Sequence, residues 1–386
     1  MTMPAARKGK IFTIAGSDSF AAALVSGITA QYGDPADPLA LARVTLLVPT
    51  RRAVLAVRKA FTDLAPTGAT LMPQILPLGD VGDDDLAGGE GEASGFEDLR
   101  AGLKPAVAPL QRQLLLAHYI AGPRDAPEPL SLATAAALAA DLMRFFGGVQ
   151  TETVDIARLA EVVPESLADH GKATLEFLKV MTEHWPGVLE ELGVMDPVAR
   201  RSAVLRQLAD KWAAQVPEGP VIIAGSTGSI PATQMLMAAV LTHAEGALVL
   251  PGLDLDLPDR VWDRVQETHP QFGLKTLLEG LDVGRSDVAP WPTSSPVDPG
   301  LAARRSILSQ AMLPAEATEG WLAFSQAAGV HETLGAAFAG LTRIEADDPR
   351  LEALTIALIM RETMETPGKS VALVTPDRGL ARRVSA

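Results

Sequence analysis

The chain has 386 residues, of which 47% are hydrophobic and 21% are charged, a composition typical of a globular protein with two or three domains. It contains no cysteine, so disulfides, thiolate nucleophiles, zinc fingers and cysteine-ligated iron–sulfur clusters are excluded within these residues. The net charge of −14 argues against a protein that coats DNA by bulk electrostatics, but it is compatible with a local basic groove.

The first 80 residues alternate between short apolar runs and segments with helical spacing. The predicted strands are Lys10–Ala15, Val44–Val48 and Leu71–Leu78. The predicted helices between them are Phe20–Tyr32 and Arg51–Leu64, and Thr50 is a plausible N-cap of the second. This alternation favours a parallel sheet covered by helices.

A polar, glycine-rich and acidic stretch over residues 79–106 is predicted to be a surface loop. Beyond it the pattern is helical, with breaks at proline and glycine. The predicted helices are Pro109–Ile120, Ser131–Phe146, Glu165–Leu192 and Pro197–Gln215. We interpret residues 109–218 as a helical insertion that interrupts the α/β domain formed by residues 1–108 and 219–300.

The α/β pattern returns after the insertion. The predicted elements are the strands Val221–Ala224 and Ala247–Leu250 with the helix Ile230–Thr242 between them. If the insertion is correctly identified, the Val221 strand lies in the same sheet as the Lys10 and Val44 strands. Residues 282–300 are rich in proline and serine and are predicted to be a loop or linker.

Residues 301–386 are predicted to hold linker helices and the start of a second α/β domain. The predicted elements are the helix Leu301–Met312, the strand Leu341–Ala346, the helix Pro349–Glu365, the strand Ser370–Val374 and a helix from Asp377. A strand followed by a barely begun helix is a poor place for a domain to end. We therefore expect that the sequence continues in the native gene or that the reading frame is shortened.

The turn after the first strand stands where a phosphate loop would lie. A working loop needs G-x-x-x-x-G-K-[ST], with a lysine for the outer phosphates and a hydroxyl for Mg²⁺. This chain has Gly16, Ser17, Asp18 and Ser19 there, and the lysine position falls on Ala21 or Ala22, depending on the register. Asp18 would repel phosphate. We predict a degenerate loop that binds no nucleotide.

The second position that an ATPase needs also lacks its chemistry. Superfamily-1 helicases end a buried strand with Asp-Glu, which holds Mg²⁺ and orients the attacking water. After Val221–Ile223 the acid positions hold Ala224 and Gly225, neither of which can ligate a metal. The six histidines are scattered without metal-ligand spacing, so we predict no catalytic residues and no metal site.

Four segments together resemble the AddB family of helicase–nuclease subunits, in its alphaproteobacterial form. They are DPLALARVTLLVPTRRAVLAVRKAF at residues 37–61, LMPQILPLGD at 71–80, PVIIAGSTGSIPATQMLMAAV with GALVLPGLD at 220–240 and 246–254, and GKSVALVTPDRGLARRV at 368–384. Their order and spacing span essentially the whole chain, which would correspond to the N-terminal part of such a subunit.

The resemblance implies a degenerate, RecA-like superfamily-1 helicase core. VPTRR at residues 48–52 takes the place of a motif that touches single-stranded DNA, and IAGSTGS at 223–229 takes that of the Mg²⁺-binding strand end. PGLD at 251–254 lacks the Gln and Arg of the sensor motif in active helicases, and ALVTPDR at 372–378 resembles the opening strand of a second motor-like domain. The family's nuclease domain, with its Mg²⁺ and its iron–sulfur cluster, is absent from these residues.

The resemblance also implies partners and a process. They are an AddA-like helicase–nuclease subunit and single-stranded or broken double-stranded DNA, in double-strand break repair by homologous recombination. No uninterrupted apolar stretch of about 18 residues occurs, so no membrane is expected as a partner and the expected location is the cytoplasm. Whether the chain is itself an enzyme stays uncertain, since the family's complex is an ATP-dependent helicase and exonuclease.

The predicted DNA-contacting residues end strands or begin helices. They are Thr50, Arg51, Arg52, Thr227, Ser229, Thr375 and Arg378. Each is equally ordinary as a solvated helix start or loop residue. Three functions compete: a non-catalytic subunit that contacts DNA, an interaction scaffold without DNA contact, and a small-molecule enzyme that uses the strand-edge hydroxyls. The missing phosphate loop and acid–base pair weigh against the third.

Overall fold

The computed structural model describes residues 8–65, 71–79, 102–121, 130–152, 184–215, 217–293 and 298–385. The chain divides into two compact units, Met1–Ala337 and Phe338–Ala386. The first unit is an α/β domain with additional helices, and the second consists of two helices and their connecting segments.

The first unit is built on a six-stranded sheet in the order β3-β2-β4-β5-β1-β6, in which all neighbours are parallel. The strands are β1 (Lys10–Ile14), β2 (Thr45–Val48), β3 (Gln74–Pro77), β4 (Val221–Ala224), β5 (Gly246–Pro251) and β6 (Ala289–Pro290). The sheet is consistent with a RecA-like α/β fold. It confirms the predicted fold class, and it confirms that the Val221 strand shares a sheet with the Lys10 and Val44 strands.

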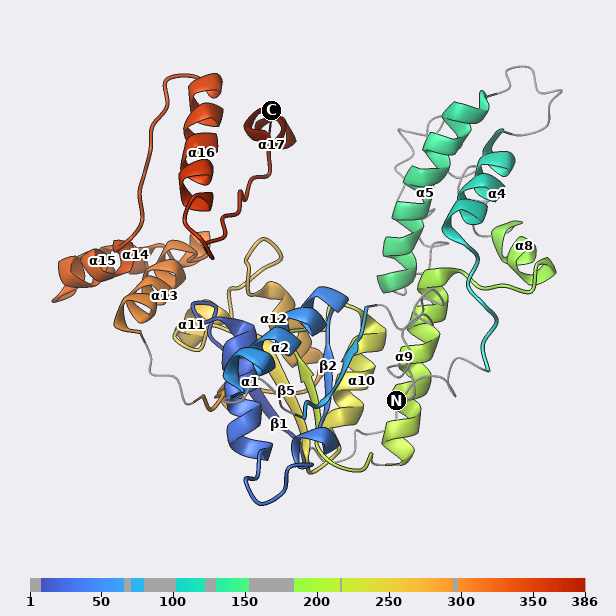
Figure 1. The fold of residues 1–386 in the computed structure, drawn as a ribbon, viewed down its shortest axis with the longest axis horizontal. Helices are drawn as coiled ribbons and strands as arrows, with labels where there is room; N and C mark the ends of the chain where they lie inside the picture. Colours follow the sequence, from blue (N-terminus) through green and yellow to red (C-terminus); the bar gives the residue numbers. More distant parts are fainter. Residues whose placement is uncertain are drawn as a thin grey trace. The chain divides into compact units, whose positions relative to one another are not determined.

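Helices cover both faces of this sheet, as Figure 1 shows. On one face, α1 (Phe20–Tyr32) and α2 (Arg51–Leu64) pack on Leu46, Ile222 and Val249. On the other, α10 (Pro231–Leu241) and α12 (Phe272–Gly280) pack on an adjacent residue of each strand, namely Leu47, Ile223 and Leu248. Side chains alternate between faces along a strand, so two buried faces require the continuous apolar runs that predicted these strands.

The described residues between β3 and β4 form helices joined by irregular segments. The helices are α4 (Pro109–Ala121), α5 (Leu132–Glu152), α8 (Trp185–Glu191) and α9 (Pro197–Ala214). Helix α9 packs along α10, while α4, α5 and α8 share a separate apolar cluster around Leu116, Leu142 and Trp185. Most of the predicted helix Glu165–Leu192 lies outside the described residues.

Helix α5 contains a 20-residue segment, Leu132–Thr151, that is long and apolar enough to cross a membrane by length and composition, and it is the one such helix in the described ranges. A core helix passes the same test. Ala135, Ala139 and Phe146 of α5 are buried against α4 in the shared cluster, so this helix packs on protein in the structure.

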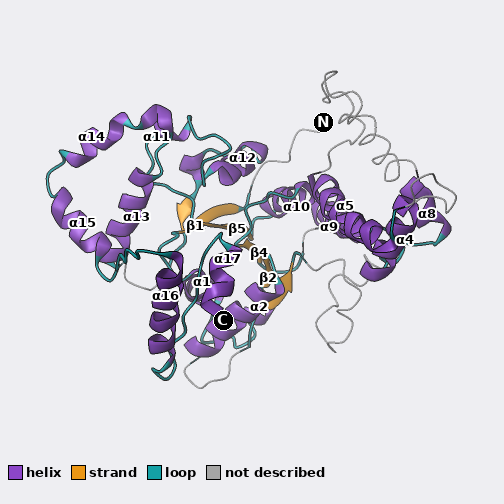
Figure 2. Ribbon diagram, turned by 90° about the horizontal axis from the view of Figure 1, so that it is seen from above, coloured by secondary structure: helices purple, strands orange, loops and turns teal. Residues whose placement is uncertain are grey.

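Short elements follow β5 within the first unit. They are α11 (Asp259–Trp262), α12, β6, α13 (Pro299–Ala311), α14 (Glu319–Ser325) and α15 (Val330–Phe338). Figure 2 shows β1 and β5 side by side, with α12 and α13 near their ends. Strand β6 has two residues and falls in the segment predicted to be a loop, where no periodic pattern marks it.

The second unit contains α16 (Pro349–Met364) and α17 (Arg378–Ser385). The strands predicted at Leu341–Ala346 and Ser370–Val374 are wrong, because the structure places residues 341–346 and 370–374 outside any sheet. A strand requires a neighbour for its main-chain hydrogen bonds. Val374 is 93% exposed, so the apolar run that predicted a buried strand is not buried in this unit.

Candidate functional site

The carboxyl ends of β1, β2, β4 and β5 lie at one edge of the sheet, where α/β folds present their ligands. A cavity of about 470 Å³ opens there, between the loop after β1 and the start of α2. Its lining is mostly small and apolar and includes Gly16, Phe20, Pro49, Ala53 and Gly225. We call it the edge cavity.

The loop after β1 has the strand–turn–helix shape of a phosphate loop without its chemistry. The amide of Asp18 donates to the carbonyl oxygen of Ala15 at 3.0 Å, which closes the turn, and the hydroxyl of Ser17 donates to Asp18 Oδ1 at 3.2 Å. The Asp18 side chain is exposed. Ala21 and Ala22, the alternative lysine positions, lie in the first turn of α1, so neither register places an ammonium group over the loop.

The end of β4 carries no side chain that can bind a metal ion. Ala224 is completely buried. Gly225 follows with φ +76, and a Cβ there would stand 3.2 Å from a ring carbon of Phe20. An aspartate or glutamate at Gly225 would therefore meet backbone strain and the Phe20 ring, so this strand end is shaped for a small residue.

The start of α2 supplies the positive charge at this edge. Thr50 caps the helix, its hydroxyl accepting from the amide of Ala53 at 3.2 Å, and it also lines the edge cavity. Arg51 and Arg52 are exposed, and the first turn holds no acidic residue. Because Val54 and Val57 are buried on the sheet side of α2, the helix is oriented with Arg51 and Arg52 exposed. The N-cap predicted at Thr50 is confirmed.

The other predicted site residues lie in two places. Thr227 and Ser229 are exposed in the loop between β4 and α10, at the same sheet edge as Thr50. The loop is shaped by Gly228, which has φ +62 and whose amide donates to the Ser226 hydroxyl at 3.2 Å. The DNA contacts of Thr227 and Ser229 stay a prediction.

Thr375 and Arg378 belong to the second unit, where they flank Asp377 at the start of α17. The Thr375 hydroxyl accepts from the amide of Asp377 at 3.1 Å, and the exposed Arg378 is the first residue of the helix. The structure therefore brings five of the seven predicted residues to one edge of the sheet and places these two in a separate unit.

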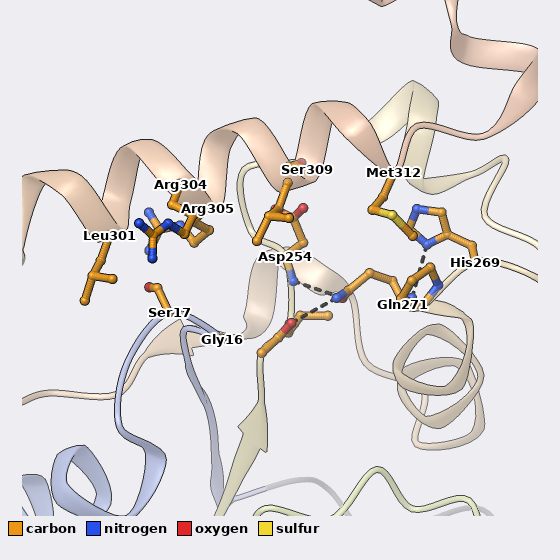
Figure 3. A pocket seen from close by; sticks show the side chains of 14 residues that line it. Gly16, Ser17, Asp254, His269, Gln271, Leu301, Arg304, Arg305, Ser309 and Met312 are labelled. Atoms are coloured by element: carbon orange, nitrogen blue, oxygen red, sulfur yellow. Dashed lines mark hydrogen bonds between the residues drawn. The ribbon is translucent and has the colours of Figure 1, made fainter. Parts of the chain in front are cut away.

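A second cavity of about 400 Å³ shares Gly16 and Gly252 with the edge cavity and lies on the α13 side of the loop after β1 (Figure 3). We call it the α13 cavity. Its Arg304 and Arg305 were missed by sequence reasoning, because adjacent arginines in the middle of a predicted helix do not reveal which one faces the domain. Within the described ranges, no three His, Asp or Glu residues gather closely enough to hold a metal ion.

Comparison with known proteins adds no identification: no protein-family model matches the chain, and no curated protein matches it.

Proposed function

We propose that the chain is a non-catalytic subunit of AddB type that contacts single-stranded DNA in a helicase–nuclease complex. The observation that carries the proposal is a combination found at the sheet edge. Exposed Arg51 and Arg52 begin a helix there, while the positions that would bind a nucleotide hold neither a lysine nor metal-binding acids. An ATPase-shaped scaffold without a phosphate lysine or metal-binding acids retains a surface for polymer contacts, not a reaction centre.

Phosphate recognition is the chemistry that this edge offers. The first amides of a helix have no partner within the helix and carry partial positive charge, so an anion there gains hydrogen bonds and a favourable field. Arginine adds bidentate, charge-assisted contacts to phosphate oxygens. The exposed Thr227 and Ser229 add hydroxyl groups on the neighbouring loop.

The partner and process rest on the resemblance of the four quoted segments to the AddB family. In this proposal an AddA-like subunit supplies ATP hydrolysis and nuclease activity, and this chain holds the displaced strand. The chain's charge of −14 supports local over diffuse binding, because a polyanion would be repelled from most of its surface.

A fluorescence-anisotropy titration with a labelled single-stranded oligonucleotide at 50 and 200 mM salt tests the DNA contact. A phosphate-binding edge gives binding that weakens as salt rises, because counterions are released on binding. No binding at either salt concentration would support the alternative, an interaction scaffold without DNA contact. Co-purification of an AddA-like subunit by a chain that binds no DNA would keep the family assignment and reject only the DNA contact.

A further inference from the structure

The α13 cavity is lined by four segments of the first unit. They are the loop after β1, the turn after β5, the residues that precede α12, and one face of α13. On α13 and its C-cap residue the lining residues recur at helical spacing: Leu301, Arg304, Arg305, Leu308, Ser309 and, as the C-cap, Met312. One whole face of this helix is therefore turned toward the domain, across the cavity.

That face of α13 is only partly covered. No residue of α13 is fully buried, and Leu308 and Met312, which line the cavity, are 57% and 45% exposed. An amphipathic helix that faces its own domain normally buries its apolar residues against it. A ligand with an apolar body would remove this surface from water without any change in the fold.

One end of the cavity is cationic. Figure 3 shows the guanidinium nitrogens of Arg304 and Arg305 close to Ser17. Arg304 Nε donates to the carbonyl oxygen of Ala337 at 2.9 Å, and Arg305 Nε lies 3.0 Å from Asp256 Oδ2 in a partly exposed ion pair. Each contact fixes its guanidinium through Nε, which orients the remaining nitrogens.

The opposite end offers a buried hydrogen-bond donor. His269 Nδ1 accepts from the amide of Gln271 at 3.1 Å, so the neutral ring carries its proton on Nε2. Nε2 is buried without a hydrogen-bond partner, and Figure 3 shows the ring beside Met312. A buried donor without an acceptor is costly, so a ligand atom that accepts from Nε2 gains by satisfying it.

The floor between the two ends is held by Gln271. Its Nε2 donates to the carbonyl oxygen of Gly252 at 2.9 Å, and its Oε1 accepts from the amide of Asp254 at 3.0 Å. These bonds join the turn after β5 to the segment that carries His269. The two hydrogen bonds of Gln271 therefore fix the distance between the cationic end and the imidazole, which favours a preformed binding site.

We propose that the α13 cavity binds a small organic anion with an apolar body. Its acidic group lies on Arg304 and Arg305, its body covers Leu308 and Met312, and an acceptor atom at its far end accepts a hydrogen bond from His269 Nε2. The size of the cavity suits a molecule of about the dimensions of a nucleoside monophosphate. Phosphate and carboxylate share this recognition chemistry. The proposal is independent of the DNA contact at α2.

The probe for this site is 8-anilinonaphthalene-1-sulfonate, an aromatic anion that becomes fluorescent in apolar surroundings. Arg304→Gln with Arg305→Gln should weaken its binding by about 10-fold or more, the scale of lost charge-assisted hydrogen bonds. Ser309→Trp should abolish binding by filling the cavity. The matched controls are Arg343→Gln, an exposed arginine of the second unit, and Ala53→Leu in the edge cavity, and both should bind the probe normally.

Competition then separates the two ligand chemistries. Displacement of the probe by adenosine 5′-monophosphate but not by benzoate assigns a phosphate ligand, and the reverse assigns a carboxylate. If the double arginine variant fails to fold, as circular dichroism would reveal, Ser309→Trp alone decides. Probe binding that is unchanged in Ser309→Trp, or displacement by neither competitor, would overturn the proposal.

Discussion

The indole ring of Trp291 lies directly against the main chain of Gly27 in α1: a Cβ atom at Gly27 would clash with the indole Nε1. The same nitrogen donates to the carbonyl oxygen of Ala23 at 3.2 Å, and the ring meets Phe12 of β1 edge to face with 5.0 Å between centroids. Trp291 follows β6, so this contact joins the edge of the sheet to α1.

Gly27→Ala should therefore lower the free energy of unfolding by about 1–3 kcal/mol, the usual cost of forcing a methyl group into a packed core. The matched control is Gly148→Ala in α5, where an added Cβ meets no atom within 4 Å. That change should stabilise by about 0.5–1 kcal/mol, since alanine is the better helix former. Urea unfolding of both variants measures the difference, and equal effects would contradict the close contact.

A buried ion pair joins α4 to the start of α9. Arg112 Nη2 lies 2.7 Å from Asp196 Oδ2, and the two side chains are 7% and 1% exposed. Asp196 also caps α9 by accepting from the amide of Val198. Burial lowers the pKa of Arg112, and Asp196 opposes that effect. Removing one partner leaves an uncompensated buried charge, so Arg112→Met should cost about 3–5 kcal/mol.

A double-mutant cycle isolates this pair. Asp196→Ser keeps an N-cap oxygen, and combined with Arg112→Met it should be less destabilising than the sum of the two single changes, by about 1–3 kcal/mol. The control cycle is the exposed pair Lys59–Asp63 on α2, where coupling should stay below about 0.5 kcal/mol. Additive effects at Arg112 and Asp196 would show that the pair does not act as a unit.

The stability of the first turn of α17 should depend on pH. Asp377 Oδ1 accepts from the amide of Gly379 at 2.7 Å. Hydrogen bonds from the amides of Gly379 and Leu380 lower the pKa of Asp377, and Arg383 adds to this. A depressed pKa means that the cap stabilises the helix above the ordinary carboxyl pKa and is lost as pH falls through the lower, folded value.

The amide chemical shift of Gly379, followed by NMR as pH falls, should move with a midpoint below the ordinary value of an aspartate. Asp377→Asn keeps the acceptor oxygen but cannot titrate, so this transition should disappear in the variant. A transition at the ordinary aspartate value, or one that persists in Asp377→Asn, would contradict the proposed cap.

Nucleotide binding should be absent at the edge cavity. Neither lysine register reaches the loop after β1, and β4 ends in Ala224 and Gly225. Isothermal titration calorimetry with ATP and Mg²⁺ should therefore show no saturable heat assignable to this site. Micromolar, Mg²⁺-dependent binding that Ala53→Leu abolishes would contradict the interpretation of a degenerate loop.

Much of the first unit was predictable because its strands are continuous apolar runs that end at proline or glycine. Arg51–Leu64 and Val221–Ala224 match α2 and β4 residue for residue. Strand order was not predictable in the same way, since the pairing of β4 between β2 and β5 depends on contacts across the helical insertion. Only the shared sheet could be inferred.

The errors have physical causes as well. Ser370–Val374 has the composition of a buried strand, but composition cannot supply a neighbour to pair with. Strand β6 has two residues, too few for any period. The α13 cavity escaped prediction because Ser17, His269 and Arg305 come from distant segments, and their proximity is a property of the fold alone.

The DNA contact at α2 is tested most directly by a salt-dependent anisotropy titration of Arg51→Ala with Arg52→Ala, against Arg343→Ala with Arg361→Ala. Both variants remove two exposed arginines, so they change the net charge equally. We expect the α2 variant to bind single-stranded DNA about 1–3 kcal/mol more weakly, with a shallower salt dependence, and the control to bind nearly as the unmodified chain does. Unchanged affinity and an unchanged salt slope in the α2 variant would contradict the proposed DNA contact.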